Sequence, residues 1–307
     1  MPALRVSCFG KLPFHREFLR AGLGSAAAAW VVRWVEGAHE CWSRAGAAPA
    51  VSSTIRFAAA LDGVGLVAGV AKQSSDGLRR HPVTFFIEDG RDPPGDEWHL
   101  APLALAPSWD ALFAFSEQPW DSIASLTAAL AAGAPEPAWD QARATYRDAL
   151  AAPLPTSPWE ALVGATGDPA RHTAANLLSV LDAQRAARSA TEGVSVAVPL
   201  QAARDMADLD SSFWVDVLHA TAPAARPVIC IGSEPPRLVV FFRPPEGPDL
   251  AAVLSSLEMA PIDDLGEPWQ ALPAAGSERA RAIDALVASG PGSLDELREQ
   301  IRSTAGQ

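Results

Sequence analysis

Two short polar clusters hold the side chains that could do chemistry in this chain. Lys11 and Glu17 follow an apolar run near the start, and Arg79 and His81 precede a second apolar run further along. A carboxylic acid, a guanidinium and an imidazole are groups that general acid–base catalysis uses. One interpretation is therefore an enzyme in which Glu17 is the acid, Arg79 holds an anion and His81 is the base.

Known catalytic motifs are absent from the sequence. It has no GxSxG nucleophile elbow, no HExxH helix, no phosphate-binding Walker loop and no set of kinase motifs. The histidines lack a second ligand at metal-site spacing, and Cys8, Cys41 and Cys230 form no CxxC pair. We therefore expect a protein that is not an enzyme, with no catalytic residue, no metal and no cofactor.

The same clusters suit a protein-binding surface. An arginine can form two parallel hydrogen bonds with a carboxylate, and arginine is frequent at binding hot spots. Lys11 directly follows a strand pattern, where it is either a solvated turn residue or a contact to a partner's carboxylate or carbonyl. The turn after the first strand and the turn before the fourth can lie at one sheet edge. We hypothesise that they form one patch containing Lys11, Glu17, Asp76 and Arg79.

Composition excludes several kinds of partner. The 307 residues are 49% hydrophobic, which supplies a large core, and they carry a net charge of −12 at pH 7. Non-specific nucleic-acid binding needs clustered Lys and Arg, so we expect neither nucleic acid nor anionic lipid as a partner. No signal-peptide pattern is visible, and the longest uncharged run, residues 122–135, is too short to span a bilayer. We expect a cytoplasmic protein without direct membrane insertion.

The patterns predict strands at both ends of the chain and helices between them. Residues 25–44 show helical periodicity with Ser25 as a good N-cap, and Asp168 is expected to cap a later helix. Ser211 or Ser212 is expected to begin another helix, and Ser277 and Ser293 begin two near the end. The expected strands cover residues 5–9, 53–61, 66–72, 83–88, 194–198, 228–231 and 238–242.

This order of elements predicts the fold class. Strands that flank a helical region favour one mixed sheet covered on both faces over two independent domains. We expect a three-layer α-β-α sandwich with a mixed, largely antiparallel sheet, a helical insertion and a C-terminal helical tail. The expected division is a single α/β domain of residues 1–256, mainly helical over 108–190, and a helical extension of residues 257–307.

Five of the ten tryptophans fall into two groups with different expected roles. Trp30 and Trp34 lie at helical spacing among apolar residues and are expected in the core. Trp98, Trp109 and Trp120 lie near Pro-rich turns, where we expect partly exposed anchors for a partner.

Several motifs together carry a family resemblance. The sharpest are Phe9-Gly10-Lys11-Leu12-Pro13 with Glu17-Phe18, and the run from Arg79 through Pro82 to Phe85. Two further segments show weaker similarity, Val196-Ala197-Val198-Pro199-Leu200 and the Phe-Trp segment of residues 212–218. In this order they resemble the TagF family, also called ImpM, of type VI secretion accessory proteins.

The resemblance implies a function and a fold. Family members are non-catalytic regulators that hold secretion in check after translation, commonly through a cytoplasmic forkhead-associated scaffold protein. Their fold is an α/β sandwich likened to longin or profilin domains. The resemblance also implies that this cytoplasmic protein is recruited to the inner-membrane secretion complex. The alternatives are a structural or assembly component of the same machine, or a longin-like adaptor for a small GTPase. The candidate partner-binding residues are Gly10, Lys11, Pro13, Glu17, Phe18, Asp76, Arg79 and Pro82.

Overall fold

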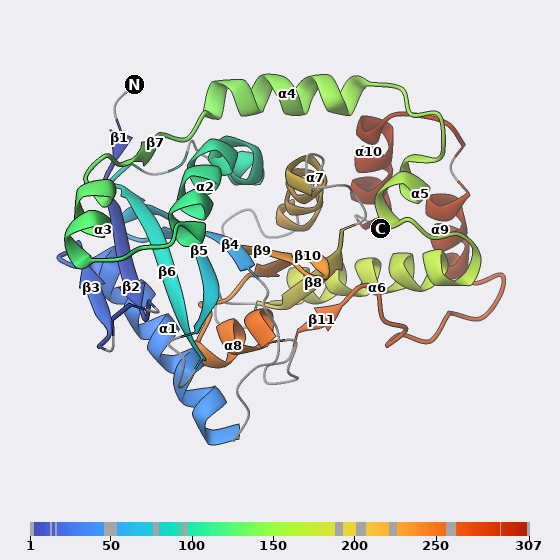
Figure 1. The fold of residues 1–307 in the computed structure, drawn as a ribbon. Helices are drawn as coiled ribbons and strands as arrows, with labels where there is room; N and C mark the ends of the chain where they lie inside the picture. The colour runs from blue at the N-terminus through green and yellow to red at the C-terminus, as the bar shows by residue number, and fades with distance from the viewer. Residues whose placement is uncertain are drawn as a thin grey trace.

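One large sheet separates two layers of helices (Figure 1). The expected α/β sandwich is therefore confirmed, with helices on both faces of a mixed, largely antiparallel sheet. The computed structural model describes residues 3–12, 14–15, 17–45, 54–75, 80–91, 93, 97–187, 193–200, 207–220, 226–255, 262–288 and 290–305.

The large sheet has nine strands within these described ranges, in the order β11-β8-β10-β9-β4-β5-β6-β2-β3. Neighbouring strands are antiparallel, except that β11 and β8 are parallel. The strands are β2 (Val6–Gly10), β3 (Leu19–Ala21), β4 (Thr54–Leu61), β5 (Gly65–Ser75), β6 (Arg80–Asp89), β8 (Ser195–Pro199), β9 (Val228–Ser233), β10 (Pro236–Phe241) and β11 (Asp263–Asp264). A small antiparallel sheet pairs β1 (Ala3–Leu4) with β7 (Ala134–Pro135).

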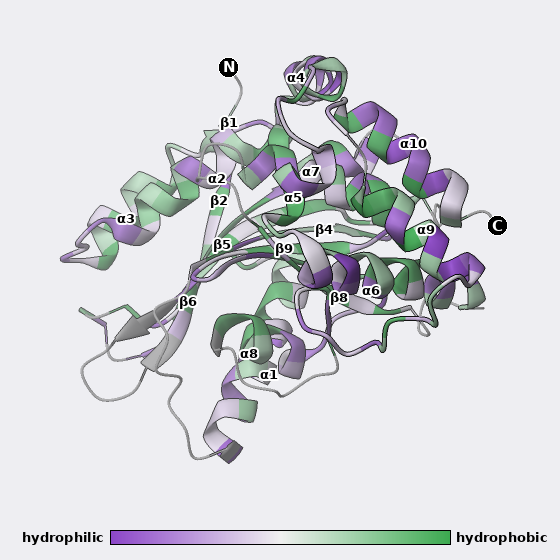
Figure 2. Cartoon of the chain, turned by 90° about the vertical axis from the view of Figure 1, so that its right-hand side faces the viewer, coloured by the Kyte–Doolittle hydropathy of each residue, from purple (hydrophilic) through white to green (hydrophobic). Residues whose placement is uncertain are grey.

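Two helices cover one face of the sheet, below it in Figure 2. They are α1 (Ala26–Ala45) and α8 (Gly247–Ser255). Ser25 caps α1 as expected, because its Oγ accepts a hydrogen bond from the N–H of Ala28 at 2.9 Å. The helices meet at a glycine pair, where a Cβ on Gly247 would lie 2.3 Å from the carbonyl carbon of Gly37. The backbones therefore approach more closely than any larger residue would permit.

The other face carries the remaining helices (Figures 1 and 2). Their buried side chains and the sheet form one hydrophobic core that includes Trp109, Trp159 and Trp214. The helices are η1 (Glu97–Leu100), α2 (Ala101–Glu117), α3 (Ile123–Leu130), α4 (Trp139–Ala151), α5 (Pro158–Val163), α6 (Gly167–Ala186), α7 (Ala207–His219), α9 (Glu278–Val287) and α10 (Leu294–Ala305).

Two of the three expected tryptophan anchors are buried, so that prediction was wrong for them. Trp98 is 4% exposed and Trp109 is 0% exposed. The reason is that η1 and α2 form a continuous helical run in place of a Pro-rich loop, and this run packs on the sheet. Trp109 Nε1 donates to the carbonyl oxygen of Phe57 at 3.2 Å. Trp120 is partly buried and donates to the carbonyl oxygen of Phe115.

Two helices begin earlier than expected. α7 starts at Ala207, so Ser211 and Ser212 lie fully buried inside the helix instead of capping it. Their small side chains suit a helix packed between the sheet and the α2 layer. Asp168 lies in the first turn of α6, one residue after the helix begins, and Thr166 is the N-cap.

The last elements pack on the same body. Ser277 Oγ caps α9 by accepting from the N–H of Ala280 at 3.1 Å. Ser293 and Glu296 form the expected capping box at the start of α10. Buried α10 side chains such as Leu297 join the main core. The division into residues 1–256 and 257–307 stays a prediction.

Candidate functional site

The two motifs that carry the resemblance meet in the structure. β2 and β6 are antiparallel neighbours, and Gly10 is paired with Val83, the residue after Pro82. The φ angle of Gly10 is +136°, and a Cβ there would lie 2.3 Å from the carbonyl oxygen of Pro82. Only glycine adopts this conformation readily and leaves this space. The contact links the end of β2 to the start of β6.

An aromatic cluster lies beside this contact. Lys11 Nζ is 5.4 Å from the centroid of the Phe18 ring, a cation–π arrangement. Phe18 stacks on the buried Phe9 ring with the centroids 5.6 Å apart, and the His39 ring meets its edge at 6.4 Å. Lys11 and Phe18 are both half-buried, so their positions are constrained although part of each faces solvent.

We call Gly10, Lys11, Phe18 and Pro82 the N-terminal patch. Four of the eight candidate residues are thus brought together, of which Lys11 and Phe18 are partly exposed while Gly10 and Pro82 are buried. A fifth candidate, Glu17, is exposed in the segment between β2 and β3. The other candidates, Pro13, Asp76 and Arg79, lie outside the described residues.

An ion pair borders the N-terminal patch on the side of α1. Arg20 on β3 places its guanidinium 5.4 Å from the Phe9 ring centroid and donates to Glu36 Oε1 at 3.0 Å. Both side chains are well exposed, so the pair contributes little to stability. The N-terminal patch is therefore bordered by one positive charge, on Arg20, and one negative charge, on Glu36.

A second polar cluster, which the sequence analysis did not identify, surrounds Asp216 on α7. Tyr146 Oη on α4 donates to Asp216 Oδ2 at 2.8 Å. Two arginines of α10 reach the same carboxylate, Arg298 at 3.2 Å and Arg302 at 2.7 Å. Asp216 is buried, so three donors from two helices compensate its desolvation. In the sequence, Asp216 stands out only by its place in the Phe-Trp segment, and that segment predicts a helix without indicating a polar cluster.

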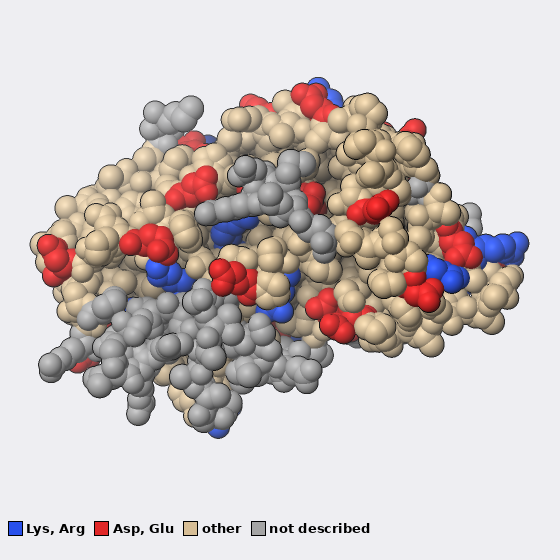
Figure 3. Space-filling model, turned by 45° about the vertical axis from the view of Figure 1, so that its right-hand side comes forward, with Lys and Arg blue, Asp and Glu red and all other residues tan. Residues whose placement is uncertain are grey.

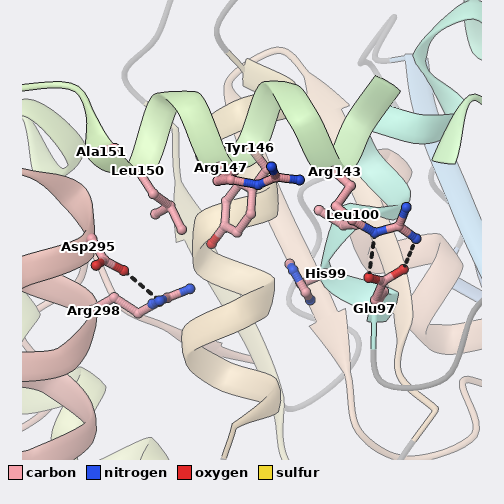
Figure 4. A pocket seen from close by; sticks show the side chains of 10 residues that line it. All are labelled: Glu97, His99, Leu100, Arg143, Tyr146, Arg147, Leu150, Ala151, Asp295 and Arg298. Carbon is pink, nitrogen blue, oxygen red and sulfur yellow. Dashed lines mark hydrogen bonds and ion pairs between the residues drawn. The ribbon is translucent and has the colours of Figure 1, made fainter. Parts of the chain in front are cut away.

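A cavity of about 340 Å³ opens next to this cluster (Figure 4). In Figure 4, α4 runs above it, η1 lies on one side and α10 on the other. The lining residues are Glu97, His99, Leu100, Arg143, Tyr146, Arg147, Leu150, Ala151, Asp295 and Arg298.

Among the groups of the cavity with displaced pKa values are Glu97 and Tyr146. The pKa of Glu97 is lowered, chiefly because its carboxylate accepts hydrogen bonds of 2.7 and 2.5 Å from Arg143. Burial raises the pKa of Tyr146, and the negative charge of Asp216 raises it further. At neutral pH the cavity therefore contains an ionised Glu97 and a neutral Tyr146.

Comparison with known proteins gives a distant likeness among solved structures. No protein-family model and no curated protein matches the chain. Among solved structures, the chain is similar to PA0076 from Pseudomonas aeruginosa PAO1, with 22% sequence identity and a TM-score of 0.34. The match covers 43% of this chain and 64% of that chain, so it spans less than two thirds of the neighbour's length. A likeness this remote carries no argument about function.

Other kinds of site find no support in the described part of the chain. No group of three His, Cys, Asp or Glu side chains there could hold a metal ion. Burial raises the pKa of the Cys8 and Cys230 thiols, which keeps them protonated. Of the described helices, none has the length and apolar character needed to cross a membrane. The face in Figure 3 carries scattered acidic side chains with fewer basic ones among them.

Proposed function

We propose that this chain is a non-catalytic accessory protein of a type VI secretion system, similar to the TagF/ImpM family. It acts as a post-translational repressor by binding a cytoplasmic forkhead-associated scaffold protein. The observation that supports this proposal most is the contact between Gly10 and Pro82. It joins the two sequence motifs of the resemblance into one structural feature.

The N-terminal patch has the chemistry of a protein-binding surface. Lys11 is half-buried against an aromatic ring, so binding a partner costs less side-chain entropy than it would for a free lysine. The Phe18 ring adds apolar area, and the exposed Glu17 adds a charge of opposite sign nearby. A partner that offers a carboxylate or carbonyl to Lys11 and apolar surface to Phe18 fits this arrangement.

Deleting the gene tests the repressor role. We expect the secreted substrates of the system to increase in the medium while the cellular amounts of the secretion subunits stay constant. Unmodified protein should restore repression, whereas Lys11→Glu should not. Arg281→Glu is the matched control, because Arg281 is exposed on α9. In Figure 1, α9 and β2 lie at opposite ends of the molecule.

The same deletion separates the two principal alternatives. Loss of secretion, instead of a rise, would contradict the repressor and favour a structural or assembly component. The third alternative, a longin-like adaptor, is compatible with the three-residue β3 at the edge of the sheet. It requires a small GTPase that co-purifies with the chain in one nucleotide state.

A further inference from the structure

The cavity beside α4 is lined by residues of η1, α4 and α10, none of which belongs to the N-terminal patch (Figure 4). We infer that it binds a small organic anion, with a phosphate or carboxylate head held by Arg147 and Arg298 and a flat apolar body. This inference is independent of the proposed secretion function. It is carried by the unpaired Arg147 and by the apolar floor of the cavity.

The side chains that line the cavity include one more basic than acidic group, and Asp140 and Asp216 beside the cavity also pair with two of its arginines. Three arginines line the cavity, against two carboxylates. The carboxylates already have partners: Glu97 is held by Arg143, and Asp295 accepts from Arg298 at 2.5 Å. The same ion pairs occupy Arg143 and Arg298, so Arg147 is the cation that remains for an entering anion.

Arg147 is the cation available to a ligand. It projects from α4 at the cavity and makes no hydrogen bond or ion pair with any residue that the structure describes. Arg298 is partly engaged by Asp216 and Asp295, so it can assist but not replace Arg147. A guanidinium presents paired N–H donors that match the oxygens of a carboxylate or phosphate.

The floor of the cavity is apolar and aromatic. Leu100 and Leu150 are buried, and the rings of His99 and Tyr146 lie with their centroids 5.1 Å apart. A volume of about 340 Å³ is within the range of small-molecule sites and too small for a folded segment of a protein. These features favour an anion with a ring or short chain over a bare inorganic ion.

Titration calorimetry of the full chain with phenyl phosphate, benzoate and inorganic phosphate tests the inference. We expect saturable binding of phenyl phosphate or benzoate, at least about tenfold tighter than that of inorganic phosphate, a difference of about 1.4 kcal/mol. Whichever organic probe binds more tightly identifies the preferred head group. Arg147→Gln should weaken binding at least about tenfold. Arg281→Gln, an exposed arginine of α9, should leave it unchanged.

Arg147 is chosen because it is exposed and unpaired within the described chain, so its loss leaves the fold intact, which a melt verifies. Three results would overturn the inference. They are no saturable binding of either organic probe, equal affinity for organic and inorganic probes, or an affinity that Arg147→Gln does not change.

Discussion

At the scale of single residues, Gly10 shows how a turn signal becomes a tertiary constraint. From sequence, Gly10 and Pro13 indicate only that the first strand stops. The structure adds that Gly10 has a positive φ and that its missing side chain leaves room for the Pro82 carbonyl oxygen. Sequence patterns do not contain this information, because the residue that would clash is on another strand.

Gly10→Ala should destabilise the protein by about 2 kcal/mol or more, since it adds both backbone strain and a clash. Gly24→Ala is the control: nothing lies within 4 Å of its Cβ position, and its effect should be within about 0.5 kcal/mol. Denaturant unfolding measures both variants. Equal stability of the two would refute the role given to Gly10.

Tyr146 is the only tyrosine in the chain, so its ionisation can be followed alone by tyrosinate absorbance. Burial raises its pKa above the ordinary value of 10.0, which means the fold favours the neutral phenol. Its contribution to stability is complete below pH 10.0 and declines as the pH rises above that value, where the unfolded chain ionises.

The absorbance of the folded protein should therefore stay flat through pH 10.0 and rise only with alkaline unfolding. In denaturant the same group should titrate at its ordinary value. A reversible rise near pH 10.0 with the fold intact would contradict the buried Tyr146–Asp216 hydrogen bond.

At the scale of elements, α7 connects the sheet to the last helix. Periodicity predicted that a helix contains Phe213 and Trp214, but not that it begins at Ala207 or that Asp216 binds α10. The local sequence favours Ser211 and Ser212 as caps, but both are buried inside α7 against neighbouring elements. The capping boxes and caps of α9 and α10 were predictable, since each depends only on residues within one turn.

Asp216→Asn should lower the free energy of unfolding by about 3 kcal/mol, because Arg298 and Arg302 then lose their shared carboxylate in a partly buried site. Asp182→Asn is the control, because it removes a partner of Arg279 that is 55% exposed. It should lower the free energy of unfolding by less than about 1 kcal/mol. Urea unfolding compares them. If both variants lose the same small amount, Asp216 does not hold α10 in place.

The ion pair between η1 and α4 should make stability depend on pH. The pKa of Glu97 is lowered in the fold, so its contribution is present above the ordinary value of 4.5 and is lost as the pH falls through the lowered value. Glu97→Gln should therefore lower the melting temperature modestly at neutral pH and match the unmodified protein in strong acid. Glu40→Gln is the control, because Glu40 pairs with Arg44 on the exposed surface of α1. Its melting temperature should not depend on pH in this way. A Glu97→Gln deficit that persists unchanged in acid would exclude this ion pair as its cause.

At the scale of the whole molecule, the layers were predictable and the order of the strands was not. Apolar periodicity located the long strands and α1, and the position of the helical region between strands indicated helices on both faces. Short edge strands such as β3 and β11 lack a periodic signal, since two or three residues gain their structure from a neighbour. The Lys11–Phe18 contact was missed for a similar reason: both residues were candidates, but only the fold shows that they touch.

We propose that the N-terminal patch binds a forkhead-associated scaffold. The most direct measurement is the Kd of the purified chain for the scaffold protein from the same bacterium, with melting curves recorded for every variant. We predict that Lys11→Glu weakens binding at least about tenfold with a nearly unchanged melt, while Arg281→Glu binds like the unmodified protein. No binding by the unmodified chain, or equal affinities for Lys11→Glu and Arg281→Glu, would refute binding of the scaffold through the N-terminal patch.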